Sequence, residues 1–171
     1  GNSRYIAERI AKALDDELFS INDRIKADSR EAVDTGSRVV IVAPTYAWRL
    51  PVIVSEWISE TDFAGAEKIW FVMDCGSQIG NAAKYNRALS DRKNLQYMGT
   101  AQIIMPENYI AMFPVPDSEE VAEIIANAEP DIDDVIARIS ASQKFAKPRN
   151  NLLDRMMSGP VNRMFYPFCV K

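Results

Sequence analysis

Short apolar runs alternate along this chain with stretches in which apolar residues recur at helical spacing. Two continuous apolar runs stand out, at residues 38–43 and 68–73. Runs of this length that are rich in β-branched and aromatic residues are typical of strands buried on both faces of a parallel sheet. A further strand is predicted at 95–105, with an irregularity at Gly99, and a short one at 17–21.

In the segments between these runs, apolar residues recur at helical spacing. Ile6, Ile10 and Leu14 recur every four residues and give an opening helix one apolar face. Shorter helices are predicted at 52–60 and at about 81–92. Strands that alternate with helices predict a doubly wound α/β sheet with helices on both faces, and ligands bind such sheets outside the carboxyl ends of the strands.

The last predicted helix is the longest and the most acidic. It covers 118–139, with an irregularity near Pro130 and an approximate capping signal that begins at Ser118. Its acidic residues could steer a redox partner, but we interpret them as a solvated helix face. They are Glu119, Glu120, Glu123, Glu129, Asp131, Asp133 and Asp134.

Composition excludes several classes of function. The chain has 171 residues, of which 47% are apolar, enough for one sizeable core. A net charge of -4 argues against a nucleic-acid surface, and no run is long enough to span a membrane. Two cysteines, Cys75 and Cys169, and no histidine leave no ligand set for zinc or iron–sulfur clusters and exclude histidine-dependent catalysis. We expect a cytoplasmic protein.

The first residues form a candidate anion site. Gly1, Asn2 and Ser3 directly precede the opening helix. The first backbone N–H groups of a helix have no intrahelical partner and carry partial positive charge, so a phosphate monoester fits there. The short side chains of Asn2 and Ser3 could cap the helix and bind phosphate oxygens. An ordinary helix N-cap is the alternative reading.

Three loops follow the predicted strands and are expected to lie at one edge of the sheet. The loop at 44–51 holds Tyr46 and Trp48 between two prolines, and the loop at 74–82 contains two glycines. The third loop covers 105–110. For any single loop, closure over the sheet end is the simpler account, but three such loops beside the opening turn favour a binding site.

These residues together resemble the flavodoxin family. Residues 1–7 are similar to the end of the phosphate loop of flavodoxin-like domains, and residues 43–51 and 76–82 to the two loops that hold the flavin ring. More narrowly, the chain resembles the flavodoxin-like module of bacterial flavodoxin–ferredoxin fusion proteins, including a stretch at 162–168. The resemblance implies a sheet of strand order 2-1-3-4-5, with a flavodoxin-like domain at 1–142 and an extension or linker toward a ferredoxin domain at 143–171.

The resemblance implies FMN-dependent electron transfer between a reduced donor and an iron–sulfur module or partner protein. Tyr46 or Trp48 would stack on the ring, whereas Asp74 is interpreted as a strand-end turn residue and Arg49 as a surface charge. Any [4Fe-4S] cluster would sit in a domain outside this chain. The implied FMN-binding residues are Gly1, Asn2, Ser3, Arg4, Pro44, Thr45, Tyr46, Ala47, Trp48, Cys75, Gly76, Gly80, Asn81 and Ala82.

The chain departs from the family pattern at both ends. The strand and half-loop that precede the phosphate turn in the family have no counterpart before Gly1, so we expect the natural chain to begin earlier. At the other end, Cys169 alone is no cluster site. Two alternative functions stay open: a flavin-dependent reductase or oxidase of a small organic substrate, and a non-redox binding module on the same fold.

Overall fold

The computed structural model describes residues 1–107 and 117–147. In these residues β2, β4 and β5 form a parallel sheet in that order, and β1 pairs with β3 in a separate parallel pair. The elements are α1 (Asn2–Leu14), α2 (Ile21–Lys26), β1 (Val33–Asp34), β2 (Arg38–Pro44), α3 (Val52–Glu60), β3 (Phe63–Ala64), β4 (Lys68–Cys75), α4 (Ala82–Arg92), β5 (Gln96–Ile104) and α5 (Ser118–Ser140).

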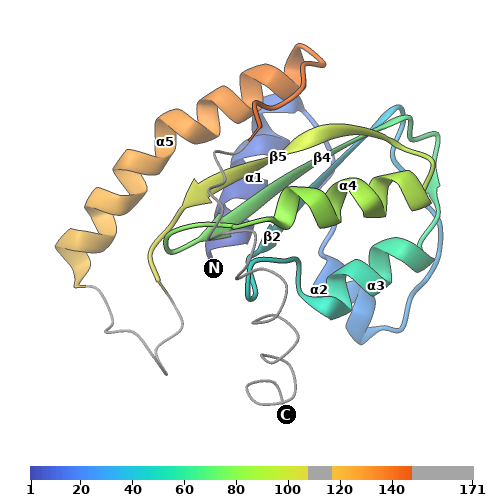
Figure 1. Cartoon of the computed structure of the whole chain (residues 1–171), viewed down its shortest axis with the longest axis horizontal. Coiled ribbons are helices and arrows are strands. Elements are labelled where there is room, and N and C mark those ends of the chain that lie inside the picture. The colour runs from blue at the N-terminus through green and yellow to red at the C-terminus, as the bar shows by residue number, and fades with distance from the viewer. Residues whose placement is uncertain (108–116, 148–171) are drawn as a thin grey trace.

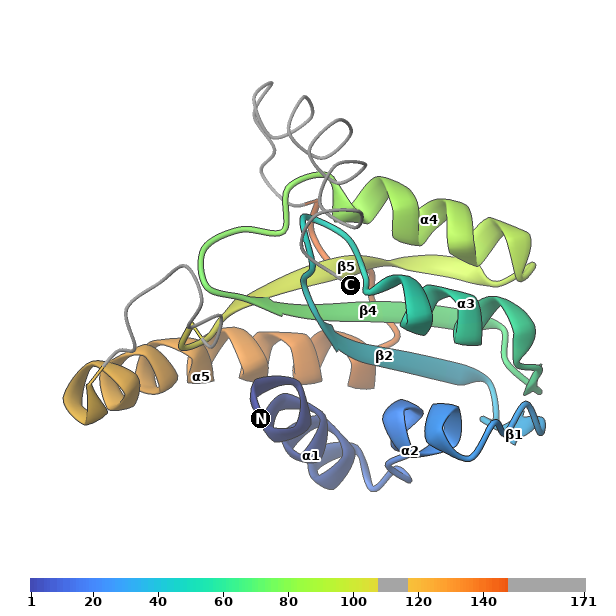
Figure 2. The same cartoon turned by 90° about the horizontal axis from the view of Figure 1, so that it is seen from below.

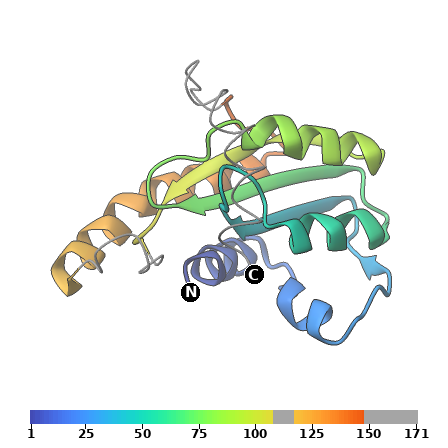
Figure 3. The same ribbon diagram turned by 60° about the horizontal axis from the view of Figure 1, so that its bottom comes forward.

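Helices cover both faces of the three-stranded sheet, as the sequence predicted (Figures 1 and 2). Helices α1 and α5 lie on one face, where Ile6 and Ile10 join the apolar side chains of α5 in one core. Helices α3 and α4 contribute Trp57 and Leu89 to the core on the other face. Figure 3 shows the same layers from an intermediate angle. Each helix in the described part of the chain is too short or too polar to cross a membrane.

Strand β4 is the centre of this arrangement. Its residues alternate between the two cores, with Ile69 and Phe71 on the α3–α4 side and Trp70 and Val72 on the α1–α5 side, all completely buried. This is the pattern that the sequence predicted for a strand covered on both faces. Strand β2 differs, because it is buried on the α3–α4 face and only half-buried on the other. It lies at the edge of the described sheet, whereas β4 has a strand on each side.

One expectation about the sheet was wrong, and another is not confirmed. Residues 17–20 are irregular and Ile21 begins helix α2, capped by the Ser20 side chain, so the short strand predicted at 17–21 is absent. The nearest strand in the chain is β1, whose partner β3 was not predicted. The described strands therefore form two sheets, and the strand order 2-1-3-4-5 is not observed as one continuous sheet.

Helix α5 begins at a strong cap. The Asp117 carboxylate accepts hydrogen bonds from the backbone N–H groups of Glu119 and Glu120, both at 2.9 Å, so Asp117, and not Ser118, is the cap. The helix continues through Pro130 as one element, although proline cannot donate the usual backbone hydrogen bond.

Part of the acidic surface of α5 binds α1. Arg9 pairs with both Glu129 and Asp133, and the Tyr5 hydroxyl donates to Glu129. These two carboxylates are thus not simply solvated, contrary to our interpretation of the acidic face. They join α5 to α1 close to the position where Pro130 weakens the backbone of the helix.

The segment that follows α5 packs against β5 at the predicted irregularity. The pairing of β4 with β5 shifts register between Ile69 and Phe71, opposite Gly99. Gly99 has φ +121°, and a Cβ atom there would lie 2.7 Å from Cβ of Phe145. The Phe145 backbone N–H donates to the Met98 carbonyl oxygen at 2.8 Å. A glycine is required here both for its conformation and for this close approach.

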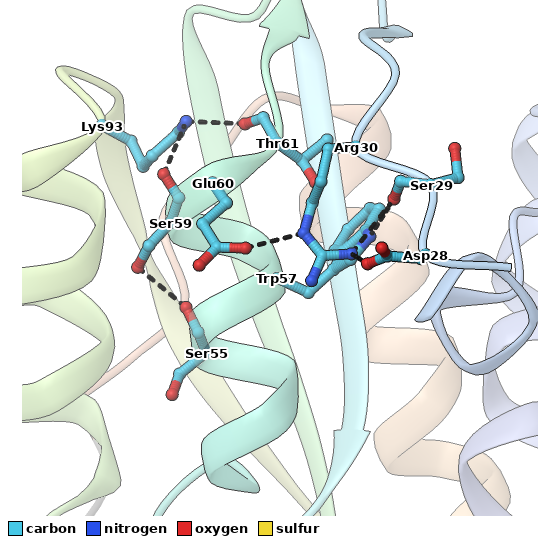
Figure 4. A network of polar contacts seen from close by, with 9 residues as sticks. All are labelled: Asp28, Ser29, Arg30, Ser55, Trp57, Ser59, Glu60, Thr61 and Lys93. Atoms are coloured by element: carbon cyan, nitrogen blue, oxygen red, sulfur yellow. Dashed lines mark hydrogen bonds and ion pairs between the residues drawn. The ribbon is translucent and has the colours of Figure 1, made fainter. Parts of the chain in front are cut away.

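Polar side chains join the C-terminal ends of α3 and α4 (Figure 4). This cluster lies at the amino ends of the strands, opposite their carboxyl ends. The Lys93 ammonium donates to the Thr61 carbonyl oxygen at 2.6 Å, and Arg30 pairs with Glu60. The Trp57 indole N–H donates to the Ser29 carbonyl oxygen at 3.2 Å. The Thr61 hydroxyl is buried and has no partner among the described residues.

We expect Gly99→Ala to lower the free energy of unfolding by about 2–4 kcal/mol, since it combines backbone strain with an atomic overlap. Urea denaturation followed by circular dichroism measures the change. Gly36→Ala is the control, because Gly36 also has positive φ (+53°) but a Cβ atom added there would meet nothing within 4 Å. It should cost only about 1 kcal/mol. Equal losses for the two variants would show that contact with Phe145 is unimportant.

Thr61→Val should raise the free energy of unfolding by about 1 kcal/mol, because it replaces a buried hydroxyl that lacks a partner with a methyl group of similar shape. The same denaturation experiment tests it. The control Thr35→Val removes an exposed hydroxyl that donates to the Gly36 and Ala64 carbonyl oxygens, each at 3.2 Å, and should leave stability unchanged or slightly reduced. A loss of stability in Thr61→Val would mean that this hydroxyl does have a stabilising partner.

Candidate functional site

The carboxyl ends of the three sheet strands are level with one another. Pro44 of β2 is paired with Asp74 of β4, and Cys75 is paired with Ile104 of β5. Backbone hydrogen bonds continue just past the strands, from the Thr45 N–H to the Asp74 carbonyl oxygen at 2.9 Å. The loops that follow β2 and β4 therefore start side by side, as parallel pairing requires.

The first turn of α1 lies at this same edge (Figure 1). Gly1 is the N-cap, and the first backbone bond of the helix runs from the Tyr5 N–H to the Gly1 carbonyl oxygen at 3.1 Å. The N–H groups of Asn2, Ser3 and Arg4 thus precede the hydrogen-bonded part of the helix. They supply donors and partial positive charge at the end of the sheet.

The side chains of this turn bind the sheet and do not cap the helix. The Asn2 amide donates to the Pro106 carbonyl oxygen at 2.9 Å, and the Ser3 hydroxyl donates to Oδ1 of Asp74 at 2.5 Å. No side-chain hydrogen bond caps α1, contrary to the expected capping role of Asn2 and Ser3. The helix end is therefore fixed to the ends of β4 and β5 while its backbone donors stay available.

A cavity of about 180 Å³ lies between the helix end and the strands. It is lined by Gly1, Asn2, Ser3, Arg4, Pro44, Tyr46 and Asp74. This volume has room for a phosphate group but not for a whole flavin nucleotide, so a ring would have to lie outside it. The backbone N–H groups at the helix end are donors suited to a phosphate monoester. The Ser3 hydroxyl donates to Asp74, and the Arg4 guanidinium pairs with Glu8 at 2.8 Å. The residues present therefore fit the phosphate end of FMN.

Asp74 is the member of this cavity whose importance the sequence did not reveal. Its side chain is only 5% exposed. Burial raises the pKa of its carboxyl above the ordinary value, although the hydrogen bond from Ser3 opposes the shift. It is the penultimate residue of β4 and contacts the helix end, so it is more than a strand-end turn residue.

The loop after β2 makes a tight and strained turn. Tyr46 and Arg49 exchange two backbone hydrogen bonds, of 2.8 and 3.1 Å, around Ala47 and Trp48. Both central residues have positive φ, +45° and +62°, which is the pattern of a type I′ turn and is unusual without glycine or asparagine. The turn leaves the Tyr46 side chain 46% exposed beside the cavity.

Arg49 connects this turn to α4. Its guanidinium carbon lies 3.7 Å from the centre of the Tyr85 ring, a cation–π contact. This corrects our interpretation of Arg49 as a plain surface charge. The loop after β4 is held by Gln102 of β5, whose side chain accepts from the Ile79 N–H at 3.1 Å and donates to the Ser77 carbonyl oxygen at 3.2 Å.

The structure divides the predicted site residues into those that line the smaller cavity and those that do not. The cavity brings together Gly1, Asn2, Ser3, Arg4, Pro44 and Tyr46, and adds Asp74. The other predicted residues do not line it: Thr45, Ala47, Trp48, Cys75, Gly76, Gly80, Asn81 and Ala82. Ala82 is completely buried in the core at the start of α4. That these loops hold a flavin ring stays a prediction, and residues 108–110 of the third loop lie outside the described part of the chain.

A larger cavity, of about 320 Å³, lies between β5 and α5. Thr100, Gln102, Asp134 and Arg138 are among the residues that line it. The two charged residues named here pair with each other at 2.6 Å. None of the predicted site residues and no helix N-terminus line this larger cavity. The smaller cavity is therefore the better candidate for the functional site. In residues 1–107 and 117–147 no three histidine, cysteine, aspartate or glutamate side chains gather as a metal site.

Cys75 is half-buried at the end of β4, and burial raises the pKa of its thiol from 9.0 to about 12. The nearby carboxylates of Asp74 and Glu107 make smaller contributions to this rise, and a backbone hydrogen bond with Ser77 opposes it. A thiol with this pKa is protonated at neutral pH and is a poor nucleophile.

Cys75 should react with iodoacetamide at pH 8 about 1000-fold more slowly in the folded protein than in urea, because a rise from 9.0 to about 12 lowers the thiolate fraction by three powers of ten. Mass spectrometry of the tryptic peptide 69–84 measures the rate.

The unfolded chain ionises this thiol above pH 9 and the folded chain does not, so the free energy of unfolding should also fall between pH 9 and 12. Equal rates of reaction with iodoacetamide in the folded and the unfolded chain would contradict the burial of Cys75.

Comparison with known proteins agrees with this geometry. The family model of the flavodoxin domain matches residues 1–104, which include α1, the β2–β4–β5 sheet and the cavity. No curated protein matches the chain. Among solved structures, an oxidoreductase from Corynebacterium diphtheriae aligns with 80% of this chain and 73% of its own, at 14% identity and a TM-score of 0.32, a likeness too low to support an inference. The chain belongs to the flavodoxin domain family.

Proposed function

We propose that this chain binds FMN and serves as an electron carrier of the flavodoxin type. The observation that supports it best is the cavity where the first turn of α1 faces the ends of β2 and β4. Flavodoxin domains in general bind FMN, and the donors in this cavity suit its phosphate. When bound, FMN supplies the chemistry of accepting and donating electrons.

In this proposal each part of the chain has a distinct task. The N–H groups of Asn2, Ser3 and Arg4 hold the phosphate. The turn at 45–48 and the loop at 76–82 lie against the ring, with Tyr46 or Trp48 stacked on it. Gly76 and Gly80 present backbone groups to the ring edge. A Cβ atom at Gly76 would overlap Oε2 of Glu107, so the missing side chain there also makes room for Glu107. Neither a general acid nor a metal ion is required.

The proposed partner is a protein or domain that carries an iron–sulfur cluster, as in the flavodoxin–ferredoxin fusions that the sequence resembles. The exposed side chains of Tyr46, Val52 and Ile53 lie on or next to the turn that would hold the ring. Apolar side chains around an exposed redox group suit a short-lived contact with such a partner. A small organic substrate that reaches the ring at the same face is the second candidate, and it would make the protein a reductase or oxidase.

The phosphate role is tested by comparing FMN with riboflavin, which lacks the phosphate. Titrations followed by flavin fluorescence should give a dissociation constant at least tenfold lower for FMN. Ser3→Asp should abolish most of this preference, because it places a carboxylate among the phosphate donors. Ser20→Asp is the matched control, since Ser20 caps α2 and aspartate also caps well. Equal binding of both flavins would contradict the phosphate site, and no binding of either would favour a non-redox module.

The electron-transfer role needs a separate measurement. The FMN-loaded protein, reduced in the absence of oxygen, should be reoxidised in one turnover by a [4Fe-4S] ferredoxin and more slowly by a soluble quinone. Rapid-mixing absorbance at the flavin bands follows the reaction. Sustained turnover with the quinone and a reduced nicotinamide, with no reaction toward the ferredoxin, would favour the reductase.

A further inference from the structure

A side-chain contact joins the turn after β2 to the start of α4, which directly follows the loop at 76–82. Arg49 is the residue that closes the turn, and Tyr85 lies in the first turn of α4. The guanidinium carbon of Arg49 lies 3.7 Å from the centre of the Tyr85 ring. This is a close cation–π contact, since such pairs attract one another out to about 6 Å. The two segments that the proposed function places against the flavin ring are therefore linked to each other.

Apolar packing supports the same link. Leu50 directly follows Arg49 and is only 5% exposed, and it shares one core with Ile79 and Ala82, which are completely buried. The loop after β4 is in turn fixed to the sheet, because the Gln102 side chain accepts from the Ile79 N–H at 3.1 Å. Tyr85 thus gives the Arg49 side chain a partner on a part of the fold that is itself held in place.

The turn has a shape that needs such a support. Ala47 and Trp48 have φ of +45° and +62°, in the left-handed region that residues with a Cβ atom rarely adopt. Strained conformations of this kind persist where the surrounding structure holds them. The two backbone hydrogen bonds between Tyr46 and Arg49 close the turn from within, and the stack on Tyr85 fixes its fourth residue from outside. Loss of the stack would free the turn to relax, and the side chains of Tyr46 and Trp48 would move with it.

We propose that Arg49 is a positioning residue for the flavin ring. Its stack on Tyr85 holds the turn at 45–48 and the start of α4 as one unit, so that the ring site is formed before the flavin binds. A site formed in advance binds more tightly, because the turn loses little conformational freedom on binding. This inference rests on the proposed FMN function, and it adds a residue that acts on the ring through Tyr46 and Trp48.

Riboflavin tests the proposal at the ring alone, because it lacks the phosphate. Arg49→Met keeps a long apolar side chain but removes the cation. It should raise the dissociation constants of riboflavin and of FMN by the same factor, about tenfold, and leave the preference for FMN unchanged. Arg87→Met is the matched control, since Arg87 stacks on Tyr97 at 4.6 Å but joins α4 to β5, and it should bind both flavins like the wild type. Unchanged riboflavin binding by Arg49→Met would overturn the proposal.

Variants of Tyr85 identify the contact that is responsible. Tyr85→Phe keeps an aromatic ring under Arg49 and should bind riboflavin like the wild type, whereas Tyr85→Leu should bind it as weakly as Arg49→Met. The double variant Arg49→Met/Tyr85→Leu should lose no more affinity than either single variant, because the two side chains form one contact. Losses that add up in the double variant would show that the two residues act separately, which would overturn the proposal.

The flavin-free protein supplies a readout that does not depend on FMN. Backbone ¹⁵N relaxation at Ala47 and Trp48 should give order parameters of about 0.85 in the wild type and in Arg87→Met, and below about 0.6 in Arg49→Met. A turn that is equally rigid in the three proteins would overturn the proposal. If the turn loosens as expected but the wild type binds neither flavin, the proposed function fails while the link between the turn and α4 stands.

Discussion

The position of β4 between β2 and β5 is the constraint on which the rest of the structure depends. Its side chains fill both cores in alternation, so a register slip of one residue would exchange the two sets. The same register sets Asp74 opposite Pro44 and Cys75 opposite Ile104. The packing of one strand therefore determines both the stability of the sheet and the composition of its ligand-facing edge.

Helix α1 is aligned with that edge by contacts along its length. Ile6 and Ile10 are buried against the sheet and α5, Arg9 pairs with Glu129 and Asp133, and Ser3 reaches Asp74. Apolar packing sets the distance of the helix from the sheet, and the polar contacts set its position along the strands. The backbone donors of the first turn consequently face a cavity that is already formed.

Much of this arrangement could be predicted from the sequence. Strands β2, β4 and β5 and helices α1, α3 and α4 follow from continuous apolar runs and helical spacing, and Gly99 marked the irregularity in β5. The strand predicted at 17–21 was wrong because Ser20 caps a helix that begins at Ile21. The short β1–β3 pair is too brief to leave a periodic signal. The roles of Asp74 and Arg49 depend on contacts with Ser3 and Tyr85, distant in the sequence, that no local pattern reveals.

The central claim is that the first turn of α1 binds the phosphate of FMN. The most direct test is the change in amide chemical shifts when the ¹⁵N-labelled protein is titrated with FMN and, separately, with riboflavin. The account predicts that the difference between the two titrations is concentrated at the amides of Asn2, Ser3 and Arg4. A difference centred instead on the β5–α5 cavity, at Gln102 and Arg138, with the α1 amides unmoved, would contradict it.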